Sequence, residues 1–433
     1  VGARVLDYYK KQDVSDLPDS ALMQRARALS LMGEVARLRG DLDGARRLYG
    51  EALAGTGEAL RRETDDPQRL FDHSQNVFWV AEIARLRGQT DNAEQGFREY
   101  KRLADRMVAL EPDNLKWRVE AQYAEANLGI VHLEQRRFPE AVVQFQRSLE
   151  AIQAVAAIDR DNADYQKSVA ESLAWLADAE RDNGRLASAI AHREQQLTLL
   201  NNLLAKSRSD VEFRQKAIPA EQALGRLYAS RGQLDPGLEH LRLAVSHASR
   251  LMPVEPDNSL WVEFAASARL ALAEHLLAAK DRAGANAETR AGCGLIGRLL
   301  RPDPDPVEWR SVSRNCATMR ARIAVDSGSP AAALTEAERA LTIARTTKSG
   351  DSTEDRYVLA GAYRLLGDVR QRAGDPVRAR QAWNAGFAVL PKAAAERPVE
   401  ASERVQLLTR LGRSGEAQPL AARLKSLGYK STA

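Results

Sequence analysis

A small residue recurs every 48 positions along most of this chain. Counting in both directions from Ala141 reaches five alanines and one glycine, at Ala45, Ala93, Ala189, Gly237, Ala285 and Ala333. Between these positions the apolar residues follow a helical spacing, and a polar break divides each period into two parts. A fixed period of this size is typical of stacked helix pairs. The sequence therefore predicts an all-α repeat protein.

A series of aromatic residues repeats with the same period. Its members are Trp117, Tyr165, Phe213, Trp261 and Trp309. Each follows closely after a break rich in Asp, Asn or Pro, which can end one helix and cap the next. Spaced aromatic faces could stack the bases of a single-stranded nucleic acid. A bulky residue beside each helix start is also what packing between successive repeats needs, and we favour that interpretation.

The turn between the two helices of a repeat has its own signature. Glycine stands there in most repeats, at Gly40, Gly88, Gly184, Gly232, Gly328 and Gly374. Glycine suits the left-handed position that follows a helix, because it has no Cβ to clash with the backbone. Arg136 and Lys280 replace it in two repeats, so we expect those two turns to differ from the others.

The spacing of small residues, together with the helix-packing glycines, resembles the tetratricopeptide repeat. The residues that carry the resemblance are Leu128, Gly129, Ala141 and Phe145, with Gly33, Gly40, Ala45, Tyr49, Ala93 and Phe97 in neighbouring repeats. The usual unit of that family has 34 residues, so each repeat here is 14 residues longer. The long repeats are most similar to the tetratricopeptide-like tails of bacterial signalling proteins that carry a Toll/interleukin-1 receptor-type or winged-helix effector. The resemblance implies an effector domain upstream of Val1.

With this resemblance we expect a right-handed superhelical solenoid of about nine antiparallel helix pairs. Residues 1–19 are expected to form an N-terminal capping helix and linker, 20–398 the solenoid, and 399–433 a shortened capping repeat. The spacing of small residues supports the last boundary, because it falls to 46 at Ala379 and to 38 at Ala417. A solenoid needs such terminal repeats to make its exposed ends soluble.

Composition and motifs exclude several classes of function. Lys and Arg number 63 against 59 Asp and Glu, a net charge of +4, which is weak evidence for nucleic-acid binding. No apolar run is long enough to span a membrane. No histidine pair has the spacing of a zinc site, and no catalytic or cofactor motif is present, so we expect no enzyme, metal or cofactor. Gly292, Gly294 and Gly297 spell G-x-G-x-x-G inside an expected helix, where close helix packing is the simpler explanation.

Two cysteines, Cys293 and Cys316, lie on consecutive expected helices. They could approach each other, but we favour two buried thiols that fill space in the core. So few cysteines also fit a reducing compartment, and we expect the protein in the cytoplasm.

The remaining candidate is a binding surface. In the tetratricopeptide family the first helix of each repeat lines the concave side, which implies that Glu34 and Arg37, Glu82 and Arg85, and Asp178 and Arg181 face a partner. Glu274 and Asp368 would continue the acidic row. The alternative is that each pair is an intrahelical ion pair contributing under about 1 kcal/mol.

Two aromatic residues complete the predicted surface. We expect Phe78 and Tyr123 to share one register in neighbouring repeats and to serve as rigid anchors for a bound segment. Core packing is the alternative for both. The leading hypothesis is thus an interaction or sensing scaffold whose partner is another protein, a peptide segment or the upstream effector domain. The rival hypothesis is nucleic-acid binding through Arg61, Arg62, Arg136 and Arg137.

Overall fold

The computed structural model describes residues 17–207, 210–300, 306–346, 352–392 and 395–431. Within these ranges the chain forms 18 α-helices and no strand. The first helices of the repeats are α2 (Asp19–Leu38), α4 (Pro67–Leu86), α6 (Leu115–Glu134), α8 (Ala163–Asp182), α10 (Val211–Ser230), α12 (Ser259–Ala278), α14 (Val307–Asp326), α16 (Thr353–Arg372) and α18 (Pro398–Arg410). The second helices are α3 (Leu42–Arg62), α5 (Thr90–Leu110), α7 (Phe138–Ile158), α9 (Leu186–Lys206), α11 (Leu234–Leu251), α13 (Arg282–Leu299), α15 (Pro330–Thr346), α17 (Pro376–Val389) and α19 (Ser414–Ser426).

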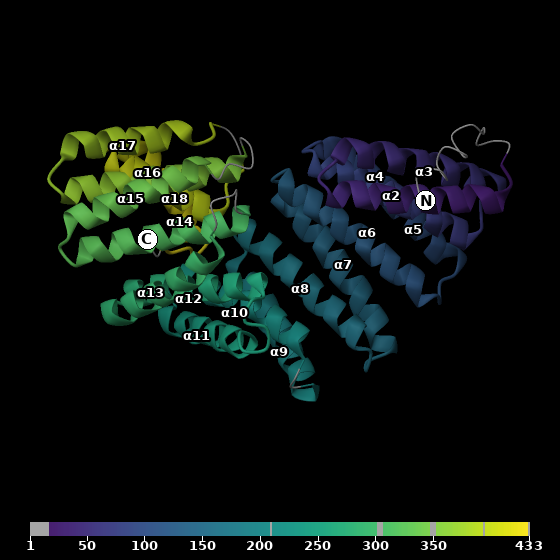
Figure 1. Cartoon of the computed structure of the whole chain (residues 1–433), viewed down its shortest axis with the longest axis horizontal. Coiled ribbons are helices and arrows are strands. Elements are labelled where there is room, and N and C mark those ends of the chain that lie inside the picture. Colours follow the sequence, from purple (N-terminus) through teal and green to yellow (C-terminus); the bar gives the residue numbers. More distant parts are fainter. Residues whose placement is uncertain (1–16, 208–209, 301–305, 347–351, 393–394, 432–433) are drawn as a thin grey trace. The chain divides into compact units, whose positions relative to one another are not determined.

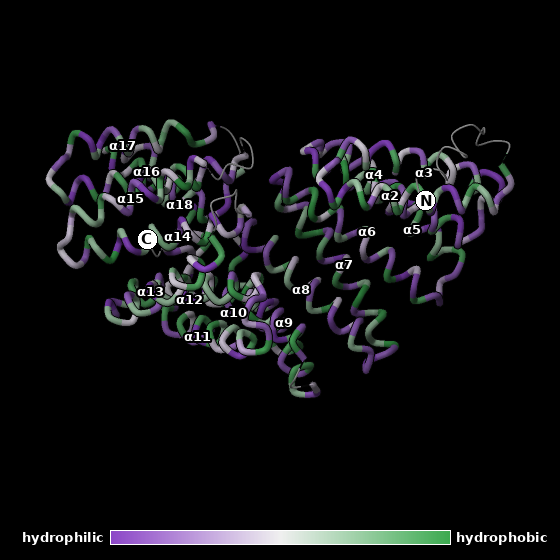
Figure 2. The backbone as a smooth tube through the Cα atoms, in the orientation of Figure 1, coloured by the Kyte–Doolittle hydropathy of each residue, from purple (hydrophilic) through white to green (hydrophobic). Residues whose placement is uncertain are grey.

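The helices repeat with the period expected from the sequence. The first helices α2 to α14 each begin 48 residues after the one before. Most contacts join consecutive helices, and they form within a pair and between neighbouring pairs. Hydrophilic and hydrophobic residues are interspersed along the helices (Figure 2), as expected where each helix has one buried and one exposed side. The prediction of an all-α helical-repeat solenoid is confirmed, whereas its right-handed sense stays a prediction.

The recurring small residue lies where the two helices of a repeat cross. Ala45, Ala93, Ala141 and the alanines in register with them up to Ala379 have no exposed surface. The facing helix carries a second small residue, and glycine there accommodates a large side chain opposite. A Cβ added to Gly129 would lie 2.8 Å from the ring of Phe145. A Cβ on Gly367 would clash with Trp383. Matched small and large residues therefore set how closely each helix pair approaches.

The prediction that two turns differ is wrong. Arg136 and Lys280 have φ angles of 61° and 66°, in the left-handed region that the turn glycines also occupy. The backbone closes the same way: Arg137 N donates to His132 O at 2.8 Å, as Asp41 N donates to Ala36 O at 2.9 Å. The hydrogen bonds and packing of the helix ends thus hold a conformation that costs a non-glycine residue about 1–2 kcal/mol.

The aromatic series occupies the third position of first helices. Trp117, Phe213 and Trp261 are less than a tenth exposed, and Tyr165 and Trp309 are half-buried. Trp117 packs in a core cluster and its Nε1 donates to Glu111 at 2.6 Å. The three buried rings cannot stack bases, so Trp117, Phe213 and Trp261 serve packing.

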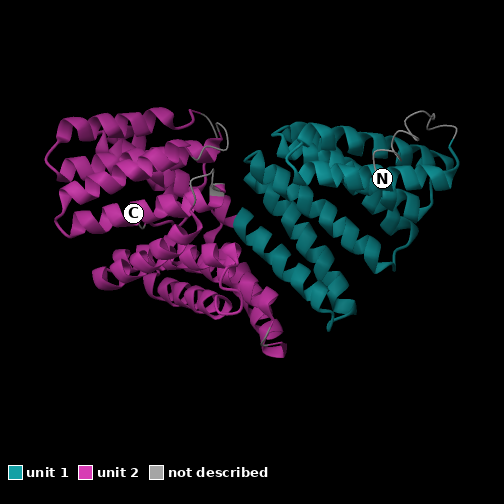
Figure 3. Cartoon of the chain, viewed as in Figure 1, with its two compact units in different colours: residues 1–179 teal, residues 180–433 magenta. Residues whose placement is uncertain are grey.

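The chain divides into two compact units, residues 1–179 and 180–433 (Figure 3). The boundary falls inside α8, so it does not coincide with the end of a helix. In unit 1 the helices follow one another side by side from α2 onward (Figure 1). The shortened last repeat, α18 and α19, has 13 residues in each helix and belongs to unit 2. Of the expected N-terminal capping helix and linker, 1–19, residues 1–16 lie outside the described residues, and Asp19 already belongs to α2.

Unit 2 has a contact that an open solenoid lacks. Its last described residues, 427–431, which we call the C-terminal segment, lie against α9, α10 and the turn that precedes α9. Lys430 N donates to Ser230 O at 2.6 Å, and Tyr429 packs with Leu186, Ala189 and Leu227. A Cβ on Gly184 would lie 2.9 Å from Leu427. Since solenoid repeats ordinarily contact only their neighbours, this segment ties the end of unit 2 to its beginning.

The prediction of free thiols is also wrong. Cys293 of α13 and Cys316 of α14 form a disulfide, with their Cα atoms 5.6 Å apart. Both residues are buried in a core cluster with Ile296 and Met319. The disulfide joins the second helix of one repeat to the first helix of the next, so it crosslinks two consecutive repeats of unit 2.

Candidate interaction surface

The two predicted charged pairs of α2 and α4 form as intrahelical ion pairs. Arg37 donates to both carboxylate oxygens of Glu34, at 2.9 and 2.6 Å. Arg85 does the same to Glu82, at 2.7 Å for each bond. The hydrogen bonds from Arg37 hold the pKa of Glu34 below its ordinary value, against the effect of burial. The ion pairs form as the structural alternative predicted, and a role of these residues in binding a partner stays a prediction.

Both pairs extend beyond their own helix. Tyr49 of α3 donates its hydroxyl to Glu34 at 3.2 Å, and the guanidinium of Arg37 lies 5.3 Å from the ring centroid of Trp79. Arg85 also pairs with Glu134 of the next first helix. Cation–π and shared ion pairs of this kind fix the arginine side chains in place. The result is an ordered row of charges along α2, α4 and α6.

The third predicted pair, Asp178 and Arg181, falls on the two sides of the boundary between the units. Arg181 donates to Asp182 at 2.8 Å, and that carboxylate also pairs with Arg397 at 3.1 Å. Arg181 is therefore part of an ion-pair network within unit 2.

The two predicted aromatic anchors have different environments. Phe78 is the twelfth residue of α4 and Tyr123 the ninth of α6, so they do not share a register. Phe78 packs against the rings of Phe97 and Tyr100, with centroids 5.8 and 5.6 Å apart. Tyr123 is 44% exposed. Tyr123 thus lies at the surface, whereas Phe78 belongs mainly to the core.

Sequence reasoning missed a second exposed aromatic residue. Trp175 of α8 is 42% exposed and stacks on Phe145, with centroids 5.6 Å apart. Trp79, two repeats earlier, occupies the same helix position and stacks on Tyr49 in the same way. The separation of 96 residues between the two tryptophans was a signal that could have found them. A ring with one face packed and the other exposed is well suited to contact a partner.

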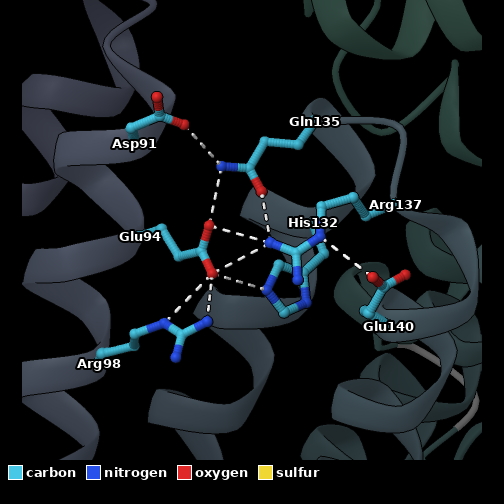
Figure 4. Close-up of polar contacts among 7 residues, drawn as sticks. All are labelled: Asp91, Glu94, Arg98, His132, Gln135, Arg137 and Glu140. Carbon is cyan, nitrogen blue, oxygen red and sulfur yellow. Dashed lines mark hydrogen bonds and ion pairs between the residues drawn. The ribbon is translucent and has the colours of Figure 1, made fainter. Parts of the chain in front are cut away.

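A polar network fixes the turn between α6 and α7 in unit 1 (Figure 4). Glu94 of α5 accepts hydrogen bonds from Arg98, Gln135 and Arg137 at 2.6, 2.9 and 3.1 Å. The buried His132 lies 3.4 Å from the same carboxylate. Burial alone would raise the pKa of Glu94, but these hydrogen bonds hold it at about 2. The network joins two repeats. It also includes an ion pair between Arg137 and Glu140.

Unit 2 contains a cavity of about 530 Å³ between α12, α14, α16 and α18. All of its lining residues come from these first helices, as the resemblance implied for a groove. Its wall carries five arginines and three acids, at Arg314, Arg322, Arg364, Arg372, Arg410, Glu274, Asp326 and Asp368. The remaining wall is largely apolar and includes Leu277, Val325 and Leu365. Sequence reasoning identified Glu274 and Asp368 but not the arginines around them.

The acids of this cavity are neutralised by arginines of neighbouring repeats. Arg322 donates to Glu274 at 3.1 Å, and Arg410 donates to Asp368 at 2.7 Å. The sixteenth position of α12, α14 and α16 carries Glu274, Arg322 and Asp368, so the sign of the charge alternates from one repeat to the next. These residues therefore do not form the acidic row that was expected to continue from unit 1.

The glycine motif lies within α13 and not at a helix start. Gly292 approaches Ala266 O, which an added Cβ would reach at 3.1 Å, whereas Gly294 and Gly297 have open space. Close packing therefore explains Gly292 alone. Among the described residues no group of His, Cys, Asp and Glu could hold a metal ion, and no helix is long and apolar enough to cross a membrane.

No protein-family model and no curated protein matches this sequence. Solved structures do share its fold. The apo form of RapI superposes with a TM-score of 0.59 at 10% identity, over 85% of each chain. The apo quorum sensor NprR from B. thuringiensis reaches 0.53 at 9% identity, covering 89% of this chain and 92% of that one. A Rap protein in complex with Competence and Sporulation Factor reaches 0.50 at 14% identity, covering 93% and 98%. This chain thus has the tetratricopeptide-like helical-repeat fold.

Proposed function

We propose that this chain is a non-enzymatic interaction scaffold that binds a segment of a partner protein on its first helices. The observation that carries the proposal is the unit 2 cavity, because only first helices line it and it combines apolar walls with charged groups. Pockets of this size with a few placed polar groups are typical ligand sites. In unit 1 the exposed rings of Tyr123 and Trp175 would supply the anchors.

The finer part of the proposal concerns signalling. NprR is a quorum sensor, and the Rap protein was solved with Competence and Sporulation Factor bound. By analogy with these proteins of like fold we propose a signalling role here, and from the resemblance of the long repeats we propose that binding regulates an N-terminal effector domain. Binding can only act in this way if the partner favours one conformation of the repeats over another.

Nucleic-acid binding is the weaker alternative. Arg61 and Arg62 pair with Glu58, Arg62 also pairs with Asp19, and Arg137 pairs with Glu94. Arginines already engaged by carboxylates contribute little to phosphate binding, because a phosphate would have to displace those partners. Binding to a mixed-sequence DNA or RNA at low salt, with steep loss at moderate salt, would favour this alternative.

The proposed compartment is the cytoplasm, and the disulfide opposes it. Disulfides are rare in reducing compartments. Acid quenching of cells followed by alkylation and mass spectrometry would measure the oxidation state of Cys293 and Cys316. Fully reduced thiols would agree with the cytoplasm, and a quantitative disulfide would indicate an oxidising compartment.

Site-specific photocrosslinking tests the scaffold proposal. A benzoylphenylalanine is placed at Tyr123 on first helix α6 or at Val143 on second helix α7, since the two side chains are 44% and 48% exposed. We expect a discrete crosslinked partner from position 123 in cells and none from position 143, and we expect Trp175→Ala to reduce the yield. Equal capture at both positions would contradict the assignment of binding to the first helices.

A further inference from the structure

One position of the first helix is buried in seven of the first eight repeats. The eighth residues of the first eight first helices are Ala26, Ser74, Gln122, Ala170, Ile218, Ala266, Arg314 and Ala360. Seven of them are neutral and at most 4% exposed. Arg314 is the single charged residue in this set, and it is only half-buried. A position that elsewhere serves packing thus carries a guanidinium in the seventh repeat.

The Arg314 side chain lines the unit 2 cavity. Each of the other four arginines in the wall is within 4 Å of a carboxylate: Arg322 of Glu274, Arg364 of Glu403, Arg372 of Asp326 and Arg410 of Asp368. Arg314 has only the side-chain amide oxygen of Asn315, at 3.2 Å, among the described residues. It is therefore the one arginine of this wall without a carboxylate partner in the described structure.

The surroundings of Arg314 favour an incoming anion. Burial lowers the pKa of its guanidinium, and Glu354 and Asp355 oppose this effect through space. Even with a lowered pKa, arginine stays protonated near neutral pH. A guanidinium at the wall of a cavity, without a carboxylate within 4 Å among the described residues, can hold an incoming carboxylate through two parallel hydrogen bonds. Gly361 also lines the cavity, where it leaves space for a ligand.

We propose that the cavity between α12, α14, α16 and α18 binds a partner peptide segment through a glutamate or aspartate carboxylate held by Arg314. Apolar residues next to that carboxylate would contact Leu277, Val325 and Leu365. This inference rests on the proposed function and names the chemistry of the bound segment. Arg314 is the one guanidinium of this wall that is not already paired with a carboxylate among the described residues, so we take a single carboxylate as its ligand.

Fluorescence anisotropy with two hexapeptide pools tests the proposal. Both pools carry fluorescein and contain Ala, Leu, Ser or Asn at five positions, with glutamate fixed at the third position in one pool and glutamine in the other. We expect the full chain to bind the glutamate pool at least tenfold more tightly than the glutamine pool. In Arg314→Gln the preference should fall below twofold. Arg339→Gln, an exposed position on second helix α15, should keep the full preference.

Arg314→Ala provides a fold-neutral variant, because alanine stands at the same position in four other repeats. Its thermal midpoint should equal or exceed that of the wild type. No glutamate preference in the wild type, or a preference that survives Arg314→Gln, would overturn the proposal. A third pool with phosphoserine at the fixed position would also overturn it by binding more tightly than the glutamate pool. A partner captured at position 123 without any glutamate preference would leave the scaffold proposal standing and remove this one.

Discussion

Units 1 and 2 are built from the same repeat but differ in the chemistry of equivalent positions. In unit 1 the eighth residues of the first helices are Ala26, Ser74, Gln122 and Ala170, all buried and neutral, and the charges at the sixteenth position pair along one helix. In unit 2 the eighth position includes Arg314, and the sixteenth position pairs charges across repeats. The position of a residue within the repeat determines the direction of its side chain. A position whose residue differs from that in the other repeats therefore indicates where a function was added.

The two units are also held together by different interactions. Unit 1 connects its repeats through buried aromatic rings and the Glu94 network. Unit 2 adds a disulfide and the C-terminal segment, which contacts residues more than 190 positions earlier in the chain. Unit 2 should therefore depend on non-local crosslinks and unit 1 on contacts between neighbours.

Reduction of the disulfide should cause the largest difference in stability between the two units. Opening a crosslink between residues 23 positions apart should lower the free energy of unfolding of unit 2 by about 3 kcal/mol. Hydrogen exchange measured by mass spectrometry should show faster exchange in α13 and α14 and unchanged exchange in α4 to α6. Cys316→Ala should make the protein insensitive to reductant. A similar loss of protection in both units would contradict the contrast.

Overpacking at the helix crossings should come next. Gly367→Ala in unit 2 should destabilise by about 2 kcal/mol, because its Cβ would meet both Trp383 and the backbone of Ala379. Gly129→Ala in unit 1 should cost about 1 kcal/mol, since the ring of Phe145 can shift. Gly294→Ala serves as the control, with a gain of about 0.5 kcal/mol, because its Cβ would meet open space within a helix. Urea unfolding would measure all three, and equal costs for the two crossing glycines would refute the expected difference.

The Glu94 network should make unit 1 sensitive to acid. The pKa of Glu94 is lowered from 4.5 to about 2, so its stabilisation is complete above about pH 4.5 and disappears as pH falls toward 2. Glu94→Gln should cost about 1.5 kcal/mol at pH 7, with allowance for solvent around its arginine partners. The difference from wild type in urea midpoints should shrink steadily below pH 4. A difference that does not vary with pH would mean that the carboxylate charge has no part in it.

The smallest effects are expected at the two turns without glycine. Lys280→Gly in unit 2 should stabilise by about 1 kcal/mol, because glycine adopts the left-handed conformation without strain. Arg136→Gly in unit 1 should gain only about 0.5 kcal/mol, because it loses the contact of the guanidinium with the ring of Phe138, 5.3 Å away. Thermal unfolding would rank the two variants, and a larger gain for Arg136→Gly would argue against the cation–π contact.

The sequence predicted the repeat well because its period is recorded twice, in Ala45 and its equivalents and in Trp117 and its equivalents. It failed where the outcome depends on distances between helices. The pairing of Cys293 with Cys316 requires Cα atoms within reach, which a spacing of 23 residues cannot establish. Phe78 was misjudged because its ring reaches two residues of α5. Arg314 could have been found, since alignment of the eighth positions isolates it.

The C-terminal segment has a consequence for how unit 2 responds to strain. In a solenoid with free ends, each repeat can tilt slightly on the next, and the small rotations add up along the stack. Leu427 against Gly184 and Lys430 on Ser230 join the two ends of unit 2, so a rotation at one interface must be compensated at another. Unit 2 should thus resist bending more than a solenoid with free ends. A ligand that spreads its repeats would first have to detach the C-terminal segment, the five residues at the end of the described chain.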